Sequence, residues 1–391
     1  MSSPRNHMVL LLMNAGVFVV IGSLLSRLHV LQEWMGISYA DFSWILFSFS
    51  CGAVISNLVG GQLIRWQGPK RILSLAMACI VLSLCGFLEK PSYAGLIALW
   101  TLLSFGFGTS MIILFSQAGT LQNQQEKGWM SFYQGISGVG VIFGMGFGWL
   151  ANSHHFPLDL HFPLVGFGLA LCMVFLIRAF EPLHQDQSEE SAPFRITFTL
   201  VLLGCINFFL LLSVSQVITW SGILLRDKFQ FKDAMAGFGS LGFLVTETGV
   251  RFVGDRLKRR LGSILLLAGG GTLCAVSLLV VFTFQYAPAA LFGMIGAGLF
   301  SGTIQPTLLS LCSLEKGNIA KNMAFVLLFQ SLAFLVGPIL SGTIAEQVGL
   351  FEIYLFSSLM SFMIVLFSVS FARWGHATVA SSSPSGDSRG I

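Results

Sequence analysis

Long apolar runs separated by short polar breaks dominate the pattern of the chain. A membrane-spanning helix needs about 20 mostly apolar residues, and twelve runs approach or exceed that length. They cover residues 8–28, 40–64, 71–88, 93–116, 128–151, 162–180, 196–226, 234–254, 261–284, 287–313, 321–345 and 350–373. The pattern therefore predicts an all-α integral membrane protein with twelve transmembrane helices.

A polar, acidic stretch divides these runs into two sets of six. It reads EPLHQDQSEESAPF and has a proline near each end, which is typical of a linker. We therefore predict an N-terminal six-helix bundle over residues 1–180, a cytoplasmic linker over 181–194 and a C-terminal six-helix bundle over 195–374. Residues 375–391 are rich in Ser and Gly and are expected to form a disordered cytoplasmic tail.

The composition supports a membrane protein and excludes several function classes. Of the 391 residues, 54% are hydrophobic and 10% are charged, whereas soluble domains carry about 25% charged residues. The net charge is +4, and no run of basic and aromatic residues indicates a nucleic-acid partner. No nucleophile–base set, phosphate-binding loop or ATPase motif is present, so we predict neither an enzyme nor a cofactor.

The positive charges predict the orientation. Most of the 21 Lys and Arg residues fall on the same side of the predicted membrane as the N-terminus. Cytoplasmic loops carry such an excess, so both termini are expected in the cytoplasm of a bacterial inner membrane. The first apolar run has no small-residue cleavage site and is expected to remain as a span.

The two halves also resemble each other in sequence. VGGQLIRWQG (59–68) aligns without gaps with VGDRLKRRLG (253–262), at an offset of 194. Two further matches at nearly the same spacing are Asn14 with Asn207 and Gln134 with Gln330. Together they suggest a duplicated six-helix unit, and parallel repeats of this kind build one large class of secondary transporters.

With these features the sequence resembles the major facilitator superfamily over essentially its whole length, and within it a bacterial branch related to fucose-permease-like proteins. The residues that carry the closer match are SRLHVLQEWMGIS (26–38), TWSGILLRDKFQFKDAMAGFGSLGF (219–243), RFVGDRLKRRLG (251–262) and FLVGPILSGTIAEQVGL (334–350). The resemblance implies two pseudo-symmetric bundles, alternating access, and a cavity lined by spans 1, 4, 7 and 10. It also implies a cytoplasmic gate motif after spans 2 and 8.

The first copy of the gate motif departs from the family pattern. Its usual acidic position is Arg65, whereas the second copy has Asp255 and Arg256. We therefore expect the charge-linked latch at Asp255. The predicted gate residues are Gly61, Arg65, Gly68, Arg71, Asp255 and Arg256.

One acidic residue, Glu247, lies deep within a predicted span, with Arg251 one helical turn further on. A charge at the bilayer centre costs about 2.5–3.5 kcal/mol, so both side chains should face protein or water. Two interpretations stay open. Glu247 and Arg251 form a stripe with Asp255 that braces the gate, or Glu247 also takes up a proton during transport.

Neutral polar residues in the spans are candidates for contact with a solute. They are Asn14, Gln117, Tyr133, Gln134, Asn207, Gln216, Trp220, Gln305 and Gln330. Each can equally form a hydrogen bond between helices. Gly140, Gly144 and Gly148, spaced four apart, are expected to allow tight helix packing.

The outer loop NSHHFPLDLHF (152–162) contains His154, His155 and His161, which are candidate metal ligands, but a solvated loop is the expectation and no metal is predicted. The seven cysteines fall in apolar segments and are expected to pack there.

These observations predict a secondary active transporter, a monomer in the lipid bilayer, that moves a small, polar and neutral solute by alternating access. Glu247 favours a proton as the coupling ion, by symport. An exporter of amphipathic, drug-like or siderophore-like compounds is an alternative, because Phe and Met could line an apolar cavity. A receptor or sensor on a transporter scaffold is another, although the short linker and tail offer no signalling domain.

Overall fold

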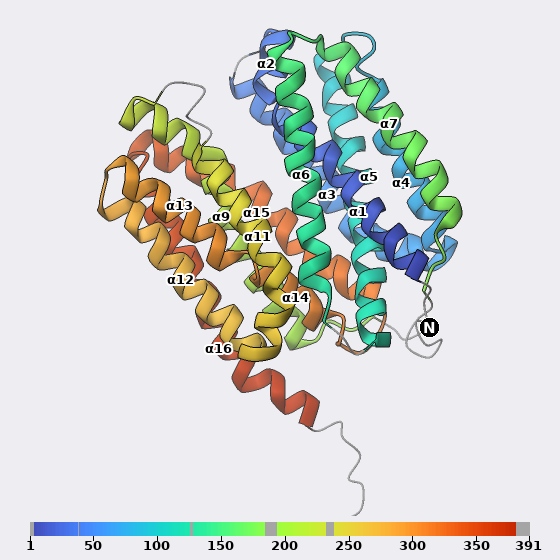
Figure 1. Ribbon diagram of the computed structural model, residues 1–391, viewed down its shortest axis with the longest axis vertical. Helices are drawn as coiled ribbons and strands as arrows, with labels where there is room; N and C mark the ends of the chain where they lie inside the picture. The colour runs from blue at the N-terminus through green and yellow to red at the C-terminus, as the bar shows by residue number, and fades with distance from the viewer. Residues whose placement is uncertain (1–3, 38, 126–127, 184–193, 232–237, 381–391) are drawn as a thin grey trace, which may run out of the picture.

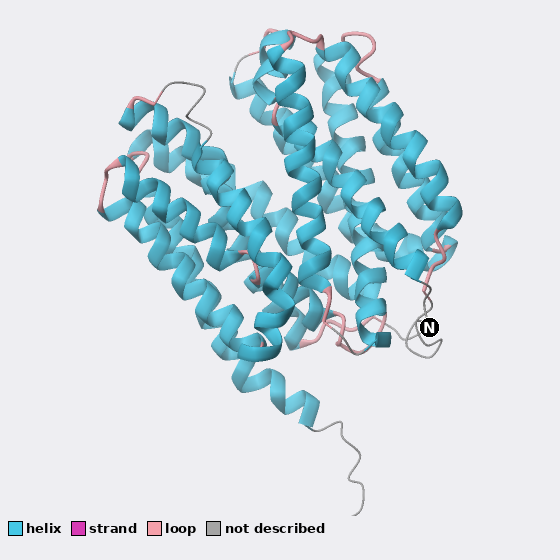
Figure 2. Ribbon diagram, in the orientation of Figure 1, coloured by secondary structure: helices cyan, strands magenta, loops and turns pink. Residues whose placement is uncertain are grey.

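The computed structural model describes residues 4–37, 39–125, 128–183, 194–231 and 238–380. Apart from short turns and connections, these residues form helices (Figure 2). Their bounds are α1 Pro4–Leu25, α2 Leu28–Met35, α3 Tyr39–Gln67, α4 Pro69–Cys85, α5 Tyr93–Gln125, α6 Met130–Ser153, α7 Leu158–Ala179, α9 Phe198–Phe229, α11 Phe238–Leu261, α12 Ser263–Thr283, α13 Ala287–Ser301, α14 Ile304–Cys312, α15 Ile319–Gln347 and α16 Glu352–Ala380.

The expected spans are present, with two differences. In the described residues, ten segments are long and apolar enough to cross a membrane, and α4 and the more polar α11 complete the set of twelve. The short helix α2, before the second span, was not predicted. The tenth span, predicted to be continuous over 287–313, is interrupted between α13 and α14.

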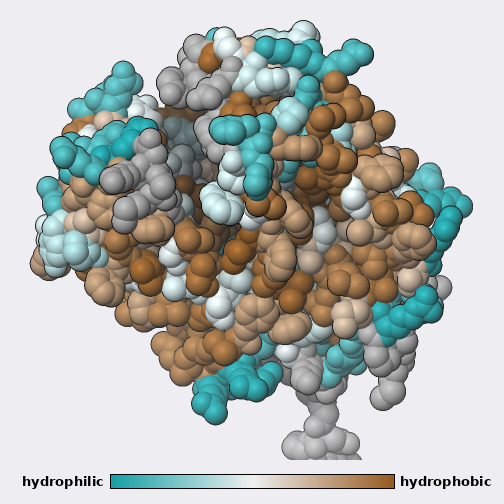
Figure 3. All heavy atoms as spheres, turned by 45° about the horizontal axis from the view of Figure 1, so that its top comes forward, coloured by the Kyte–Doolittle hydropathy of each residue, from teal (hydrophilic) through white to brown (hydrophobic). Residues whose placement is uncertain are grey.

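The helices form two bundles, seen side by side in Figure 1. Helices α1 to α7 form the N-terminal bundle and α9 to α16 the C-terminal bundle. The bundles touch mainly through α3 with α15 and α6 with α11. They diverge toward the top of Figure 1. We call the end where α1 begins and α16 ends the terminal face, and the other end the opposite face. Figure 3 shows a broad apolar belt with hydrophilic residues gathered above and below it, as expected for a membrane-spanning surface.

Backbone geometry supports the predicted repeat in the two matching loops. Gly68 precedes α4 with φ 80° and ψ 154°, and Gly262 precedes α12 with φ 80° and ψ 159°. Such positive φ values favour glycine, which explains why both copies of the motif end in Gly. The N–H of Gly68 donates to Ile64, and the N–H of Gly262 donates to Lys258, again at an offset of 194.

Two buried asparagines repeat the same hydrogen bond. The Nδ2 atom of Asn14 in α1 donates to the carbonyl of Tyr133 in α6, over 2.9 Å. The Nδ2 atom of Asn207 in α9 donates to the carbonyl of Val326 in α15, over 3.1 Å. Both pairs lie 119 residues apart.

This register corrects one match proposed from the sequence. Since Tyr133 corresponds to Val326, the counterpart of Gln330 is Ser137 rather than Gln134. Ser137 also accepts a hydrogen bond from Asn14, over 2.8 Å. A one-turn shift in α6 relative to α15 is hidden in sequence, because glutamines occur on both helices.

The glycine stripe of α6 packs against α1, as the spacing predicted. A Cβ atom added to Gly140 would lie 2.5 Å from the carbonyl oxygen of Ala15, and one added to Gly144 would lie 2.0 Å from that of Val19. The two backbones therefore approach too closely for any side chain at these positions.

The disordered tail was predicted to begin at residue 375, within the last helix. Helix α16 continues to Ala380, so residues 375–380 are helical rather than disordered. Residues 381–391, and 184–193 of the predicted linker, lie outside the described residues.

Candidate functional site

At the terminal face, Asp255 joins the two bundles. Its carboxylate accepts hydrogen bonds from the backbone N–H groups of Ser131 (3.3 Å) and Phe132 (3.1 Å), in the first turn of α6. A carboxylate at a helix N-terminus interacts favourably with the free N–H groups and the helix dipole. Here the acid belongs to α11 of the other bundle, so this capping bond also holds the bundles together. The residue at which a latch was expected therefore contacts the opposite bundle.

A second polar junction between the bundles lies beside it. Gln122 of α5 donates to the hydroxyl of Ser310 in α14, over 2.6 Å, and Lys258 of α11 donates to the same hydroxyl. Asn123 donates to the carbonyl of Ser313, over 2.6 Å. We call these contacts, together with those of Asp255, the terminal gate. Sequence reasoning did not assign Gln122 or Asn123 to a gate, because amides carry no charge pattern.

The matching junction in the other half has a different chemistry. In the register set by Gly68 and Gly262, the counterpart of Asp255 is Gly61, and that of Arg65 is Arg259. Gly61 packs against Lys321 near the start of α15, and the charge of Arg65 acts on Lys321. Residue Asn318 caps α15 within its own bundle. Among the described residues, the capping carboxylate therefore occurs at Asp255, whereas the matching position holds glycine.

The remaining residues of the predicted gate motif lie at the surface. Arg71 and Arg256 are exposed, and Gly68 shapes the turn before α4.

A further acid, Glu315, follows α14 outside the spans, and burial raises the pKa of its carboxyl. Its Oε2 atom accepts a hydrogen bond from Thr197.

Deeper in the molecule, Glu247 and Arg251 form an ion pair. The Nη2 atom of Arg251 lies 2.7 Å from Oε1 of Glu247, and their side chains are 11% and 15% exposed. The Nε atom of Arg251 also donates to the carbonyl of Gly302, over 3.2 Å. Sequence spacing predicted the pair, whereas the contact with Gly302 depends on the packing of α11 against α13.

Amides from three helices of the C-terminal bundle meet in one network. The Nε2 atom of Gln305 in α14 donates to Oε1 of Gln330 in α15, over 2.7 Å, and to Oδ1 of Asn207 in α9, over 3.5 Å. Both glutamines are half-buried. Among the described residues, Oε1 of Gln305 and Nε2 of Gln330 have no hydrogen-bond partner. The network therefore has one free acceptor, Oε1 of Gln305, and one free donor, Nε2 of Gln330.

In the N-terminal bundle, Gln134 presents a further free amide. It is buried in α6, and neither amide atom has a partner among the described residues. One turn along α6, Gly138 packs against Thr248 of α11. Gln134 therefore lies near the face where the bundles meet. The backbone carbonyl of its neighbour Tyr133 accepts from Asn14, and its buried hydroxyl has no partner among the described residues.

Four other predicted residues bond within the protein. Gln117 donates to the carbonyl of Leu183 and accepts from its N–H, so it fastens the chain after α7. Gln216 is buried and donates to Leu212 of its own helix. The indole N–H of Trp220 donates to Ser341 of α15. Asn14 likewise bonds between helices through Nδ2, while its Oδ1 atom has no partner among the described residues.

The histidines of the outer loop do not converge. His154 and His155 are exposed, whereas His161 is buried in α7 and bonded to the hydroxyl of Ser23 over 2.7 Å. No group of three metal-ligating side chains occurs among the residues that the structure describes. The three histidines are separated because α7 begins at Leu158 and turns His161 into the bundle.

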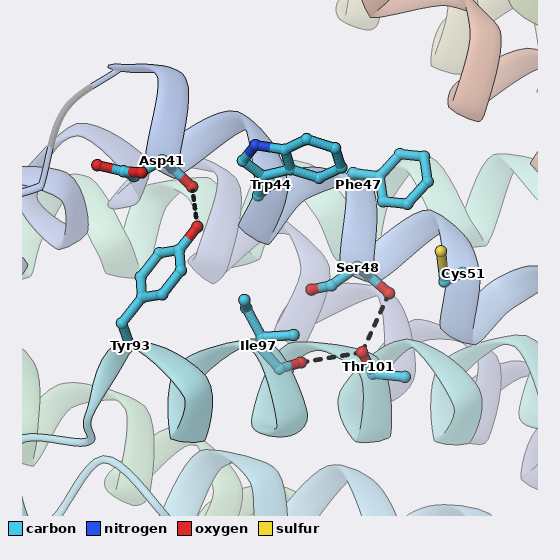
Figure 4. Close-up of a pocket in the computed structure, with 8 residues that line it drawn as sticks. All are labelled: Asp41, Trp44, Phe47, Ser48, Cys51, Tyr93, Ile97 and Thr101. Atoms are coloured by element: carbon cyan, nitrogen blue, oxygen red, sulfur yellow. Dashed lines mark hydrogen bonds between the residues drawn. The ribbon is translucent and has the colours of Figure 1, made fainter.

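A cavity of about 530 Å³ lies elsewhere, in the groove between α3 and α5 (Figure 4). Its lining includes Trp44, Phe47 and Ile97 and contains none of the predicted solute contacts. Its hydroxyls bond to backbone carbonyls, as Tyr93 does to Asp41. The predicted solute contacts therefore lie outside this cavity.

Comparison with known proteins places this geometry in a family. The sequence profile of the Major Facilitator Superfamily matches residues 8–318. The chain is 22% identical over 342 residues to the membrane protein MosC of Rhizobium meliloti, covering 85% of this chain and 82% of MosC. It is 23% identical over 326 residues to an uncharacterized MFS-type transporter of Yersinia pestis, covering 80% of this chain and 82% of that protein.

Solved structures share the fold. The human organic anion transporter MFSD10 aligns with a TM-score of 0.75 and 14% identity, over 94% of this chain and 100% of that one. FucP in its outward conformation aligns with a TM-score of 0.75 and 13% identity, over 92% of this chain and 98% of FucP. The proton:xylose symporter XylE aligns with a TM-score of 0.76 and 12% identity, over 94% of this chain and 96% of XylE. At these identities the likeness establishes the arrangement of helices.

Proposed function

The chain belongs to the Major Facilitator Superfamily of membrane transporters, and from this premise we propose that it carries a small, polar, neutral solute across the bacterial inner membrane together with a proton. The terminal face is then the cytoplasmic face, as the positive charges predict. Closure of the terminal gate, with bundles that diverge at the opposite face, corresponds to an outward-facing state. The observation that carries the proposal is the largely buried Glu247–Arg251 ion pair on the membrane-spanning helix α11.

The neutral character of the solute follows from the charge balance of the interior. Glu247 and Arg251 neutralise each other. The unpaired polar atoms on α6, α14 and α15 include those of Gln134, Gln305 and Gln330, which are uncharged amides. Amides supply both donors and acceptors without favouring either sign of charge. A solute with hydroxyl or amide groups matches them. FucP and XylE, which share the fold, are described as a fucose:proton symporter and a proton:xylose symporter.

The coupling role of Glu247 follows from its depth. A carboxylate held by one arginine can exchange that partner for a proton, and the two states differ by one charge within a low-dielectric interior. A proton gradient can then drive the cycle, because protonation and solute binding favour different conformations.

The Glu247→Gln variant tests the proposal, since it fixes the neutral form. A thermal-shift screen against sugars, amino acids, nucleosides and siderophores identifies a ligand, which is then followed in liposomes with and without a pH gradient. The variant should still bind this ligand. Its gradient-driven uptake should fall roughly 5- to 150-fold, the range of typical coupling free energies.

The exposed Glu346 of α15 provides a control. Glu346→Gln removes the same charge outside the polar interior, and its uptake should keep the wild-type gradient dependence. Gradient dependence that is unchanged in Glu247→Gln would show that this residue does not carry the proton.

A second prediction separates solute contacts from structural amides. Gln305→Leu and Gln330→Leu should each weaken binding of the identified ligand by about 1–3 kcal/mol, because a polar group of the bound solute loses its partner. Gln117→Leu should leave that affinity unchanged and lower the melting temperature, since Gln117 holds Leu183. Calorimetric titration and thermal unfolding measure the two effects. Equal losses of affinity in all three variants would contradict the assignment.

A further inference from the structure

The interruption of the tenth span has a covalent cause. Helix α13 ends at Ser301 and α14 begins at Ile304. In a continuous helix, the carbonyl of Gly302 would accept the N–H of residue 306. That residue is Pro306, which has no N–H and whose ring crowds the carbonyl four residues earlier. The carbonyl of Gly302 is therefore left without its helical partner.

Arg251 supplies the missing donor. Its Nε atom donates to the carbonyl of Gly302 over 3.2 Å, while its Nη2 atom holds the carboxylate of Glu247. Helix α11 and the end of α13 are in close contact at this point: a Cβ atom on Gly302 would lie 2.7 Å from the carbonyl oxygen of Glu247. One guanidinium thus connects the buried acid to the interrupted backbone of the tenth span.

The segment beyond the interruption carries half of the terminal gate. Helix α14 holds Ser310, which accepts from Gln122 across the interface. Ser313, which follows α14 directly, accepts from Asn123. A change in the angle between α13 and α14 therefore acts on the contacts that close the terminal face.

Few other charges can influence Glu247. Helices α13 and α14 contain no Asp, Glu, Lys, Arg or His, and α6 contributes Tyr133 as its one titratable side chain over Met130–Ser153. The charge of Glu247 acts on the thiol of Cys274 in α12. The charged residues of α9 are at its last turn, near the opposite face. Arg251 is therefore the charge that responds first to Glu247.

We propose that Arg251 is the positioning residue that transmits the protonation state of Glu247 to the terminal gate, through its hydrogen bond to the carbonyl that Pro306 leaves free. When Glu247 is ionised, it anchors the guanidinium so that Nε stays on Gly302 and α14 keeps its angle. When the carboxylate binds a proton, the anchor is lost and α14 is free to move away from Gln122 and Asn123. The proposal rests on the proposed function, because it takes Glu247 as the proton carrier.

The test measures the width of the gate directly. Nitroxide labels are attached through Gln125→Cys in the N-terminal bundle and Leu314→Cys in the C-terminal bundle, in a chain whose seven native cysteines are replaced. Both positions are exposed beside the gate. Pulsed electron resonance gives the distance distribution in lipid nanodiscs between about pH 9 and about pH 5, the range in which buried carboxyl groups titrate.

In the otherwise unchanged chain, acidification should increase the long-distance population about tenfold or more. Glu247→Gln should show the long distance at both ends of the range, and Arg251→Gln should lose the pH dependence. Pro306→Ala is the decisive variant, because it restores an N–H for Gly302 and leaves the ion pair intact. Its distances should not change with pH.

Pro338→Ala is the matched control. Pro338 also lies inside a helix of the C-terminal bundle, α15, but it is remote in sequence from Arg251. This variant should keep the full pH dependence. That result would show that the loss of pH dependence in Pro306→Ala does not follow from removing any helical proline.

The outcomes distinguish the two proposals. If Glu247→Gln retains the wild-type pH dependence, the proton-carrier role itself is wrong. If Glu247→Gln loses the dependence while Pro306→Ala keeps it, Glu247 carries the proton but Arg251 does not act through Gly302. Failure of Arg251→Gln to fold leaves the test intact, since Pro306→Ala decides the point.

Discussion

Replacing Asp255 with alanine is expected to open the terminal gate without a change of pH. The carboxylate accepts two backbone N–H groups at the start of α6, and hydrogen bonds to a charged group contribute about 1.5–3 kcal/mol. These bonds exist only when the bundles meet at the terminal face. Losing about 1.5–3 kcal/mol shifts the ratio of closed to open molecules roughly 10- to 150-fold toward the open state.

Labels at Gln125 and Leu314 measure the shift as a growing long-distance population. Asp255→Asn keeps an acceptor oxygen without the charge, so its effect should be intermediate. Arg260→Ala removes an exposed charge from the same helix and should leave the distances unchanged. A distance distribution for Asp255→Ala that matches the wild type would mean that the amide contacts alone hold the gate.

The second large effect is expected on stability, from Gly144→Val. A Cβ atom at this position would lie 2.0 Å from the carbonyl oxygen of Val19, and backbone on both sides leaves no flexible side chain to move. Forcing extra atoms into a packed interface costs typically about 1–3 kcal/mol, and more where backbone must shift. The melting temperature of the purified protein should fall by about 1–4 °C.

Gly146→Val provides the control for this prediction. Gly146 lies on the same helix, and a Cβ atom there would meet nothing within 4 Å. Both variants carry the same helix-propensity change, so a difference between them reports the contact between α1 and α6. Equal melting temperatures would contradict the packing argument.

The fold was accessible from sequence because a bilayer imposes a simple rule. Backbone groups in lipid must pair within their own segment, so length and hydropathy alone predict helices. The rule failed at residues 287–313, where hydropathy is continuous but Pro306 and Gly302 interrupt the helix. It also passed over α2, which is too short to be read as a span.

The candidate site was predictable only in part. The i, i+4 spacing of Glu247 and Arg251 places them on one face of any helix, so their pairing needed no tertiary information. The nine neutral polar residues looked alike in sequence. Packing separated them, because Gln117 meets the linker and Gln216 its own helix, whereas Gln305 and Gln330 keep free atoms.

The terminal gate was likewise predictable only in part. The sequence indicated an acid at Asp255 and its loss in the first half, since charge and motif spacing are local properties. It could not show that this acid caps α6 of the other bundle. Such facts depend on how two bundles meet.

The class of protein, the number of spans, the repeat and the deep ion pair could be predicted without tertiary information, because each follows from hydropathy, from motif spacing or from the geometry of a single helix. Helix packing determines which amides remain free, which carbonyl Arg251 contacts and which face is closed. Those properties arise where helices distant in the chain pack together, and side-chain contacts at such interfaces leave no periodic signal in the sequence.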